Sequence, residues 1–269
     1  MAGPGRVFLM YHELEQHGRP LCQSEPGYAR YVITADNFRS QMRFLQQTGW
    51  RGLSVTEAFS SSASDAVVIT FDDGCETDLL IAAPVLKDAG FGATFYITAG
   101  FVGKPGYLSP NQLRELGDSG FDIGCHSMTH PYLIDIDEAG LQREIVVAKE
   151  KLEQMTGGRV AHFSCPGGHC DRRVVQIAKQ AGYRSVATSH AQVNTETTDP
   201  FALGRVAIKR GTELEAFQRI CRGQGLRKLR LIHLARLTAR RLMGNSRYDA
   251  LRTSLMGPGP GRDVRKPGT

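Results

Sequence analysis

The sequence contains a single tryptophan and no long apolar run. Trp50 is the only Trp among 269 residues, which argues against a carbohydrate-binding surface built from stacked indole rings. No stretch approaches the roughly 20 apolar residues that a membrane-spanning helix needs. Residues 1–10 also lack the apolar run of a secretion signal. These absences predict a cytoplasmic protein.

The six cysteines do not show the spacing of a disulfide framework. In a reducing compartment they are expected to be free thiols. Four of them stand close to the polar motifs described below, so a metal site with sulfur ligands is one interpretation. The favoured interpretation is that they are small buried residues packed beneath the site. These four are Cys75, Cys125, Cys165 and Cys170.

Positive charge is concentrated at the carboxyl end. Residues 1–200 carry 17 Lys and Arg against 23 Asp and Glu, whereas residues 201–269 carry 16 against 4. We therefore expect a catalytic domain over residues 1–210, a basic helical appendage over 211–256 and a disordered tail over 257–269. Residues 226–243 have the pattern of an imperfect amphipathic helix, which could lie on an anionic membrane or pack on the domain. No nucleic-acid-binding motif accompanies this charge.

Short apolar runs alternate with helical segments over the first 210 residues. Capping boxes start helices at Ser54 and Ser109, and Asp137 and Asp171 are predicted N-caps. This alternation predicts an α/β fold of parallel strands, either a doubly wound sheet or a closed barrel. In both, active sites lie at the carboxyl ends of strands. The predicted strands are Arg6–Tyr11, Ala66–Phe71, Ala93–Ile97, Phe121–Cys125, Val160–Cys165, Tyr183–Ala187 and Leu203–Ile208.

Two adjacent carboxylates, Asp72 and Asp73, end the most apolar of these strands, followed by Gly74. Like charges at this distance repel, and a bound cation would remove the repulsion. Neighbouring side chains of an extended backbone diverge, so the two carboxylates can have different roles. The alternative is a polar turn with a capping Asp.

Two histidines, His126 and His130, follow the strand that ends at Cys125. Residues four apart share one face of a helical turn, which predicts that both imidazoles can reach one ion. Two His and one carboxylate form the three-ligand arrangement of catalytic metal sites. A pair of histidines in this spacing is also common without a metal.

A third segment, Ser164-Cys-Pro-Gly-Gly168, also follows a strand and predicts a defined loop. Taken in order, the three segments resemble the polysaccharide deacetylase family, the NodB-homology proteins of carbohydrate esterase family 4. The segment Ala82–Tyr96 fits as well, and the resemblance covers roughly residues 6–210. It implies a distorted (β/α) barrel of about seven strands.

The resemblance also implies an activity, the metal-dependent removal of N-acetyl groups from N-acetylhexosamine in a glycan or a lipid-linked precursor. Asp73, His126 and His130 match the family's ligands for a divalent metal, usually zinc, and Asp72 matches its catalytic base. Tyr132, with its backbone amide near the developing oxyanion, is expected to line the substrate groove. The others expected there are Pro166, Gly167, Gly168 and Arg205.

Three elements of the family pattern are missing, and one of them is the Asp-x-x-Asp-Trp segment, since the only Trp is Trp50. The third segment often begins with an Arg that braces the catalytic Asp, but this position is Ser164, and Arg205 is the nearest candidate to replace it. The late Leu-x-x-His motif that supplies the general acid is also absent after residue 170, and His12 is the favoured substitute. Weaker candidates are His169 and His190, whereas His162 and His233 are interpreted as structural.

These departures leave alternatives open. One is an amide hydrolase that acts on a non-sugar substrate. Another, from a different functional class, is a catalytically impaired protein that binds a glycan or a membrane. The presence of Asp72 together with all three ligand types favours the enzyme.

Overall fold

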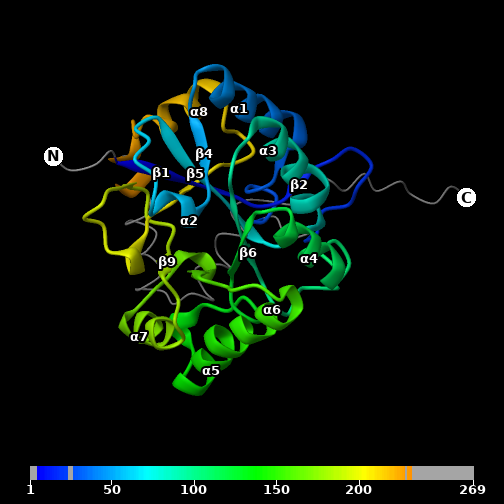
Figure 1. Ribbon diagram of the computed structural model, residues 1–269, viewed down its shortest axis with the longest axis vertical. Helices are drawn as coiled ribbons and strands as arrows, with labels where there is room; N and C mark the ends of the chain where they lie inside the picture. Colours follow the sequence, from blue (N-terminus) through cyan, green and yellow to red (C-terminus); the bar gives the residue numbers. More distant parts are fainter. Residues whose placement is uncertain (1–4, 24–26, 228, 232–269) are drawn as a thin grey trace, which may run out of the picture.

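The computed structural model describes residues 5–23, 27–227 and 229–231. Figure 1 shows the strands in the middle of the molecule, with helices around the outside. The strands are β1 (Arg6–Tyr11), β2 (Leu14–Glu15), β3 (Ile33–Thr34), β4 (Arg51–Leu53), β5 (Ala66–Asp73), β6 (Thr94–Ile97), β7 (Asp122–Cys125), β8 (His162–Ser164), β9 (Ser185–Ala187), β10 (Val193–Asn194) and β11 (Val206–Ala207). The α-helices are α1 (Ala35–Gln47), α2 (Val55–Ala58), α3 (Ala83–Ala89), α4 (Pro110–Asp118), α5 (Glu138–Gln142), α6 (Ala148–Thr156), α7 (Arg172–Gln180) and α8 (Leu214–Cys221).

The main sheet has the order β10-β1-β5-β6-β7-β8-β9, and all its pairs except β1 with β10 are parallel. The segment before and within β11 joins its two ends. Leu203 bridges to Ala187 at the end of β9, and Val206 pairs with Leu9 of β1. The sheet is thereby curled into the distorted barrel that the resemblance implied, and the first strand lies beside the last, as expected for His12.

The two faces of the barrel strands differ in what they bury. On the outer face, the rings of Tyr11, Phe71 and Phe95 stack in sequence, with centroids 5.2 and 4.9 Å apart, beneath the helices. A smaller apolar cluster includes Val68 and Tyr96 and fills the barrel interior. Because side chains alternate along a strand, Asp72 on β5 shares the face of Val68. The apolar interior therefore ends in a carboxylate.

The predicted helix starts are confirmed. Ser54 and Ser109 form capping boxes with Glu57 and Gln112, which begin α2 and α4. Asp171 caps α7, which runs over the predicted residues. The helix predicted from Asp137 is interrupted by one π-helical turn, Arg143–Val147, and ends at Gly157 in the left-handed conformation. A second π-helical turn, Asp78–Ala82, precedes α3.

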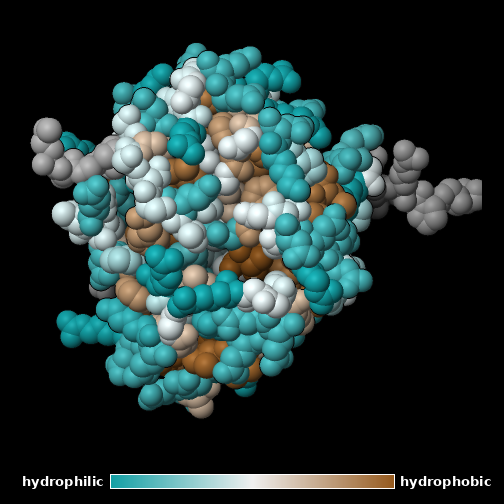
Figure 2. Space-filling view, in the orientation of Figure 1, coloured by the Kyte–Doolittle hydropathy of each residue, from teal (hydrophilic) through white to brown (hydrophobic). Residues whose placement is uncertain are grey.

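Other features were missed or lie beyond the described residues. The short strands β2, β3, β4 and β10 have only two or three residues each, too few to show a periodicity. Helix α8 begins the predicted appendage, but most of residues 226–243 and the whole 257–269 tail lie outside the described residues. No helix in the described part has both the length and the apolar character needed to cross a membrane. The face in Figure 2 is mostly hydrophilic, with small separate hydrophobic patches.

Candidate active site at the carboxyl ends of the strands

Asp72 and Arg205 form a buried, two-pronged ion pair at the top of the barrel interior. Arg205 Nη1 and Nη2 each donate to one Asp72 carboxylate oxygen at 2.7 Å, and the two residues are 1–2% exposed. Arg205 also donates to the hydroxyls of Thr70 and Ser164 and to the carbonyl of Thr188. Its guanidinium lies 5.2 Å from the centre of the Tyr96 ring. These contacts place the buried Arg205 side chain beneath the carboxylate of Asp72.

This pair keeps the Asp72 carboxylate ionised. Burial alone would raise the pKa of Asp72, but the Arg205 charge and the nearby His126 outweigh it and hold the pKa well below its usual range. The side chain of Ser164 is the reason that the guanidinium fits here. Its hydroxyl accepts from Arg205 Nη2 at 2.6 Å, at the position where the family pattern often has Arg.

Asp73, His126 and His130 converge beside Asp72. Asp73 Oδ1 lies 3.7 Å from His126 Nε2 and 3.6 Å from His130 Nε2, and none of these distances is a hydrogen bond. Asp73 Oδ1 is buried and has no hydrogen-bond partner. Two ligands placed 2.0–2.2 Å from a tetrahedral ion lie about 3.4 Å apart, so these spacings fit a shared metal. An ion here would also satisfy the orphaned oxygen.

The imidazole of His126 is oriented for this role. Its Nδ1 lies 2.8 Å from the carbonyl oxygen of Ser164, which makes Nδ1 the donor and leaves the Nε2 lone pair facing Asp73. Burial lowers the pKa of His126 to about 4, so the ring is neutral at neutral pH, as a ligand must be.

The two histidines do not lie on a helical turn, contrary to the prediction. Residues 126–130 form an irregular loop in which Ser127 and His130 have φ of 68° and 64°. With Asp73, at 83°, they are the only non-glycine residues of the described chain with positive φ. Backbone strain of this kind is held in place by the surrounding structure and concentrates at functional sites. This backbone conformation, and not helical spacing, brings the two histidines together.

Glu144 holds this loop and was not anticipated from the sequence. Its carboxylate, 1% exposed, accepts from the backbone amides of Met128 and Thr129 and from the Thr129 hydroxyl at 2.7–2.9 Å. Glu144 lies in the π-helical turn Arg143–Val147. A charged residue on the buried side of an otherwise regular helical segment was the only available signal.

His12 lies within this constellation. The charged groups that act on it are Asp73, Asp72, Arg205 and His130, and its ring packs 5.0 Å from that of Tyr31. Its Nδ1 is buried without a hydrogen-bond partner. Burial lowers the pKa of His12, while the two aspartates oppose this shift.

The other histidine candidates occupy different surroundings. His169 contacts Tyr132, with ring centroids 5.5 Å apart, and His190 forms hydrogen bonds with Thr188. His162 is 1% exposed and bonds to the hydroxyls of Ser185 and Thr56, which agrees with its structural interpretation. His233 lies outside the described residues.

The loop of the third motif is partly buried. Pro166 and Gly168 are buried, and only Gly167 is exposed. A Cβ on Gly167 would come within 2.6 Å of the Tyr132 ring, and one on Gly168 within 2.2 Å of Ser189 Oγ. Of the loop, then, only Gly167 is exposed, beside the ring of Tyr132, while the others fix the backbone.

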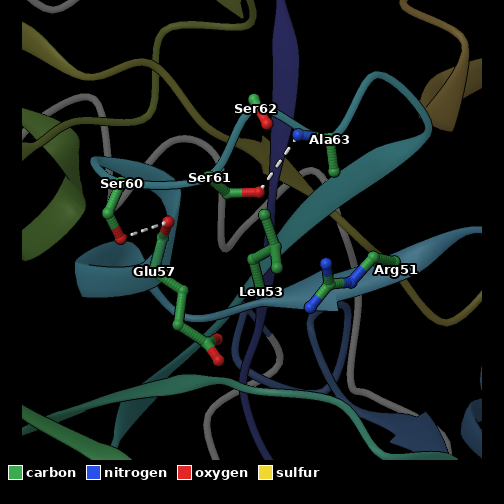
Figure 3. Close-up of a pocket in the computed structure, with 7 residues that line it drawn as sticks. All are labelled: Arg51, Leu53, Glu57, Ser60, Ser61, Ser62 and Ala63. Carbon is green, nitrogen blue, oxygen red and sulfur yellow. Dashed lines mark hydrogen bonds between the residues drawn. The ribbon is translucent and has the colours of Figure 1, made fainter.

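A separate depression lies at the amino-terminal end of the strands. Its volume is about 390 Å³, and Figure 3 shows Arg51, Leu53, Glu57 and the Ser60–Ala63 turn around it. Arg51 pairs with Ala66 at the start of β5, the opposite end from Asp72. It contains none of the convergent ligands, so we do not interpret it as the active site.

Comparison with known proteins agrees with this geometry. Residues 60–186 match the family model described as polysaccharide deacetylase. This range contains Asp72, Asp73 and both histidines. Through this segment, the chain is similar to the polysaccharide deacetylase family. Asp72 and the three convergent ligands thus lie within the matched segment, whereas His12 and Arg205 lie outside it.

Individual polysaccharide deacetylases extend the similarity across most of the described fold. A polysaccharide deacetylase from Bacillus cereus, BC0361, has a structure that matches with a TM-score of 0.70 at 28% identity, covering 81% of this chain and 69% of that one. The Bacillus subtilis protein YxkH is 27% identical over 78% of this chain and 73% of its own length. A peptidoglycan-N-acetylglucosamine deacetylase of B. cereus is 30% identical, but the match covers 50% of this chain and 61% of that protein.

Proposed function

We propose that this protein is a metal-dependent N-deacetylase of N-acetylhexosamine in a glycan or glycan precursor. The observation that carries the proposal is the buried, ionised Asp72 beside the convergent Asp73, His126 and His130. A carboxylate base next to a three-ligand metal cluster is the arrangement that hydrolysis of an amide by activated water requires. The B. cereus relative named as a peptidoglycan-N-acetylglucosamine deacetylase supports the sugar substrate.

Asp73, His126 and His130 would hold a divalent metal, with zinc as the favoured ion. When bound, such a metal supplies Lewis-acid chemistry, polarising an acetamide carbonyl and making water more acidic. Asp72 accepts the proton of the attacking water, and Arg205 fixes the direction of its oxygens. The C–N bond then breaks, and the amine nitrogen takes a proton to give acetate and a free amino sugar.

The proton donor to the amine is proposed to be His12. Its unpartnered Nδ1 and its position among Asp72, Asp73 and His130 support this role. Asp72, which has just received a proton, is the alternative donor. The predicted cytoplasmic location, the lipid-linked substrate and the membrane contact of 226–243 stay predictions from the sequence.

Acetate release tests the proposal. The substrates are N-acetylglucosamine oligomers, lipid-linked N-acetylhexosamine and a panel of non-sugar acetamides. Asp72→Asn should lower kcat by about 10²–10⁴-fold, the usual contribution of a general base. Asp137→Asn is the matched control, because Asn replaces Asp equally well as the N-cap of α5.

Three results would contradict the proposal. Full activity in Asp72→Asn would reject the assigned base. Turnover of non-sugar acetamides alone would favour the general amide hydrolase. A chain that contains no metal and releases no acetate would favour the impaired glycan-binding protein.

A further inference from the structure

A second group of metal-ligating side chains lies behind the candidate active site. The carboxylate of Glu13 and the thiols of Cys22 and Cys75 each offer one ligand atom, and these atoms all lie within 4.8 Å of one another. Among the described residues, only this group and the Asp73 cluster meet that condition. Glu13 and Cys22 lie nine residues apart, and Cys75 comes from a distant segment that follows the end of β5.

Each member of the group is held by local contacts. The backbone amide of Cys22 donates to both oxygens of Glu13, at 3.0 and 3.2 Å. Cys22 Sγ lies 2.9 Å from the carbonyl oxygen of Gly106, and Cys75 Sγ lies 3.3 Å from the hydroxyl of Tyr28. Glu13 is 1% exposed and Cys75 is 0% exposed, whereas Cys22 is half-buried at the edge of the group.

A neighbouring carboxylate supplies an independent observation. Asp78 is 0% exposed, and neither of its side-chain oxygens has a hydrogen-bond partner. Burial raises the pKa of Asp78, and the groups that act on it most strongly, Cys22, Asp73, Glu13 and Asp72, raise it further. A buried carboxylate without a donor or a cation is strongly unfavourable.

Protein cations do not resolve this excess of acidic groups. Arg19 is the cation that acts on Glu13, but it forms its own ion pair with Glu76. A disulfide between Cys22 and Cys75 would remove two thiols and leave Glu13 and Asp78 as they are. A divalent ion bound by both thiolates and by Glu13 would use all three convergent ligand atoms, so it accounts for more of the arrangement.

We propose that Glu13, Cys22 and Cys75 bind a second metal ion of the zinc class, with Asp78 as the adjacent carboxylate. Thiolates select soft or borderline ions, and two sulfurs with one or two carboxylate oxygens suit tetrahedral zinc. Ligands around such an ion lie about 3.4–3.8 Å apart, given bonds of about 2.0–2.3 Å, and the three ligand atoms here lie within 4.8 Å of one another.

The proposed ion would join three segments that border the active site. Cys75 follows Asp73 by two residues, Glu13 follows His12, and Cys22 touches the turn that contains Gly106. Tyr107 in that turn bridges to Cys75 through the backbone. The role is therefore structural support of the wall near Asp73 and His12, in contrast to the solvent-accessible first site, where His130 is 37% exposed.

Cobalt substitution tests this proposal independently of enzymatic activity. The full chain is depleted of metal under nitrogen with a reductant and titrated with Co²⁺. Thiolate ligands give an intense near-ultraviolet charge-transfer band, whereas His and carboxylate ligands do not. We expect the band in the wild type and in His126→Ala/His130→Ala, and its loss in Cys22→Ser/Cys75→Ser. Zinc analysis of these proteins should show one ion fewer per chain in each double variant than in the wild type.

Matched controls keep the result decisive. Cys221→Ser removes a buried thiol from α8 and should retain the band. If the double cysteine variant does not fold, Glu13→Gln retains both thiols and should weaken cobalt binding by at least the about 10–100-fold typical of lost supporting ligands. The proposal is overturned if the wild type gives no band, if the band follows His126 and His130, or if protein purified without reductant contains a Cys22–Cys75 disulfide.

Discussion

Replacement of Arg205 by Met tests the central electrostatic argument. Arg205→Met keeps a long apolar side chain but removes five donors and the charge that faces Asp72. The carboxylate of Asp72 is then buried without a counter-ion. Loss of one partner from a buried ion pair destabilises a fold by about 3–5 kcal/mol. Because Thr70, Ser164 and Thr188 also lose a donor, we expect a value at the upper end of that range.

The pKa of Asp72 determines how the stability deficit of Arg205→Met changes with pH. In the wild type the pKa of Asp72 is held below its ordinary value, so the ion pair stabilises fully above about pH 4 and weakens as pH falls through the folded-state pKa. Without Arg205, burial acts on Asp72 with less opposition and raises its pKa. Protonation then relieves the buried charge, so the variant's deficit should shrink as pH falls from 7 to about 4.5.

Urea unfolding at pH 7 and at about pH 4.5 measures the free energy of unfolding of the wild type and of each variant. Adding Asp72→Asn to Arg205→Met should recover about 1–3 kcal/mol, because the stranded charge is removed. Arg39→Met, which breaks an exposed pair with Asp36, should change the free energy of unfolding by less than about 1 kcal/mol and serves as the control. Strictly additive effects of the two substitutions, with the same deficit at both pH values, would refute the reasoning.

Two further predictions concern the active-site neighbours. For His12→Ala, we expect a lower kcat and loss of the pH step at which wild-type activity falls as His12 deprotonates. Burial places this step below the ordinary histidine pKa of about 6.5. A pH profile of unchanged shape would remove His12 from the mechanism. For Glu144→Gln, we expect about 1–3 kcal/mol of destabilisation and weaker metal binding. The neutral amide loses the charge-assisted hydrogen bonds that the carboxylate accepts from the three donors of the His126–His130 loop. Wild-type affinity in a calorimetric metal titration would contradict this.

The sequence predicts those parts of the fold that depend on local signals. The strands that carry the motifs, the capping boxes at Ser54 and Ser109 and the N-cap at Asp171 depend on short-range periodicity and hydrogen bonding, and the structure shows them. The choice of a barrel over an open sheet came only from the family resemblance. Closure depends on the Leu203 bridge and the pairing of β11 with β1, about 200 residues apart, which no local pattern encodes.

The candidate site was also predicted only in part from the sequence. Residue types and spacing predicted which ligands to consider, but not how they converge, because the positive φ angles of Asp73, Ser127 and His130 depend on tertiary contacts. Glu144 could not be selected, since a Glu on a helix is ordinarily exposed. The pairing of Cys22 with Glu13 was also missed, because Cys22 stands far from every motif.

The replacement of an Arg at the third motif by Ser164 has a consistent physical explanation. The base at the end of β5 faces a barrel interior that is otherwise apolar, so a cation has to reach it from one of the neighbouring strands. β8 ends at Ser164, and β11, which closes the barrel, brings Arg205 to the same point from the other side. The space beside Asp72 is filled by this guanidinium, and a small hydroxyl at position 164 both leaves room for it and accepts one of its protons. A second Arg at position 164 would place like charges together in a buried site. Ser164 and Arg205 therefore act together to keep the Asp72 carboxylate ionised.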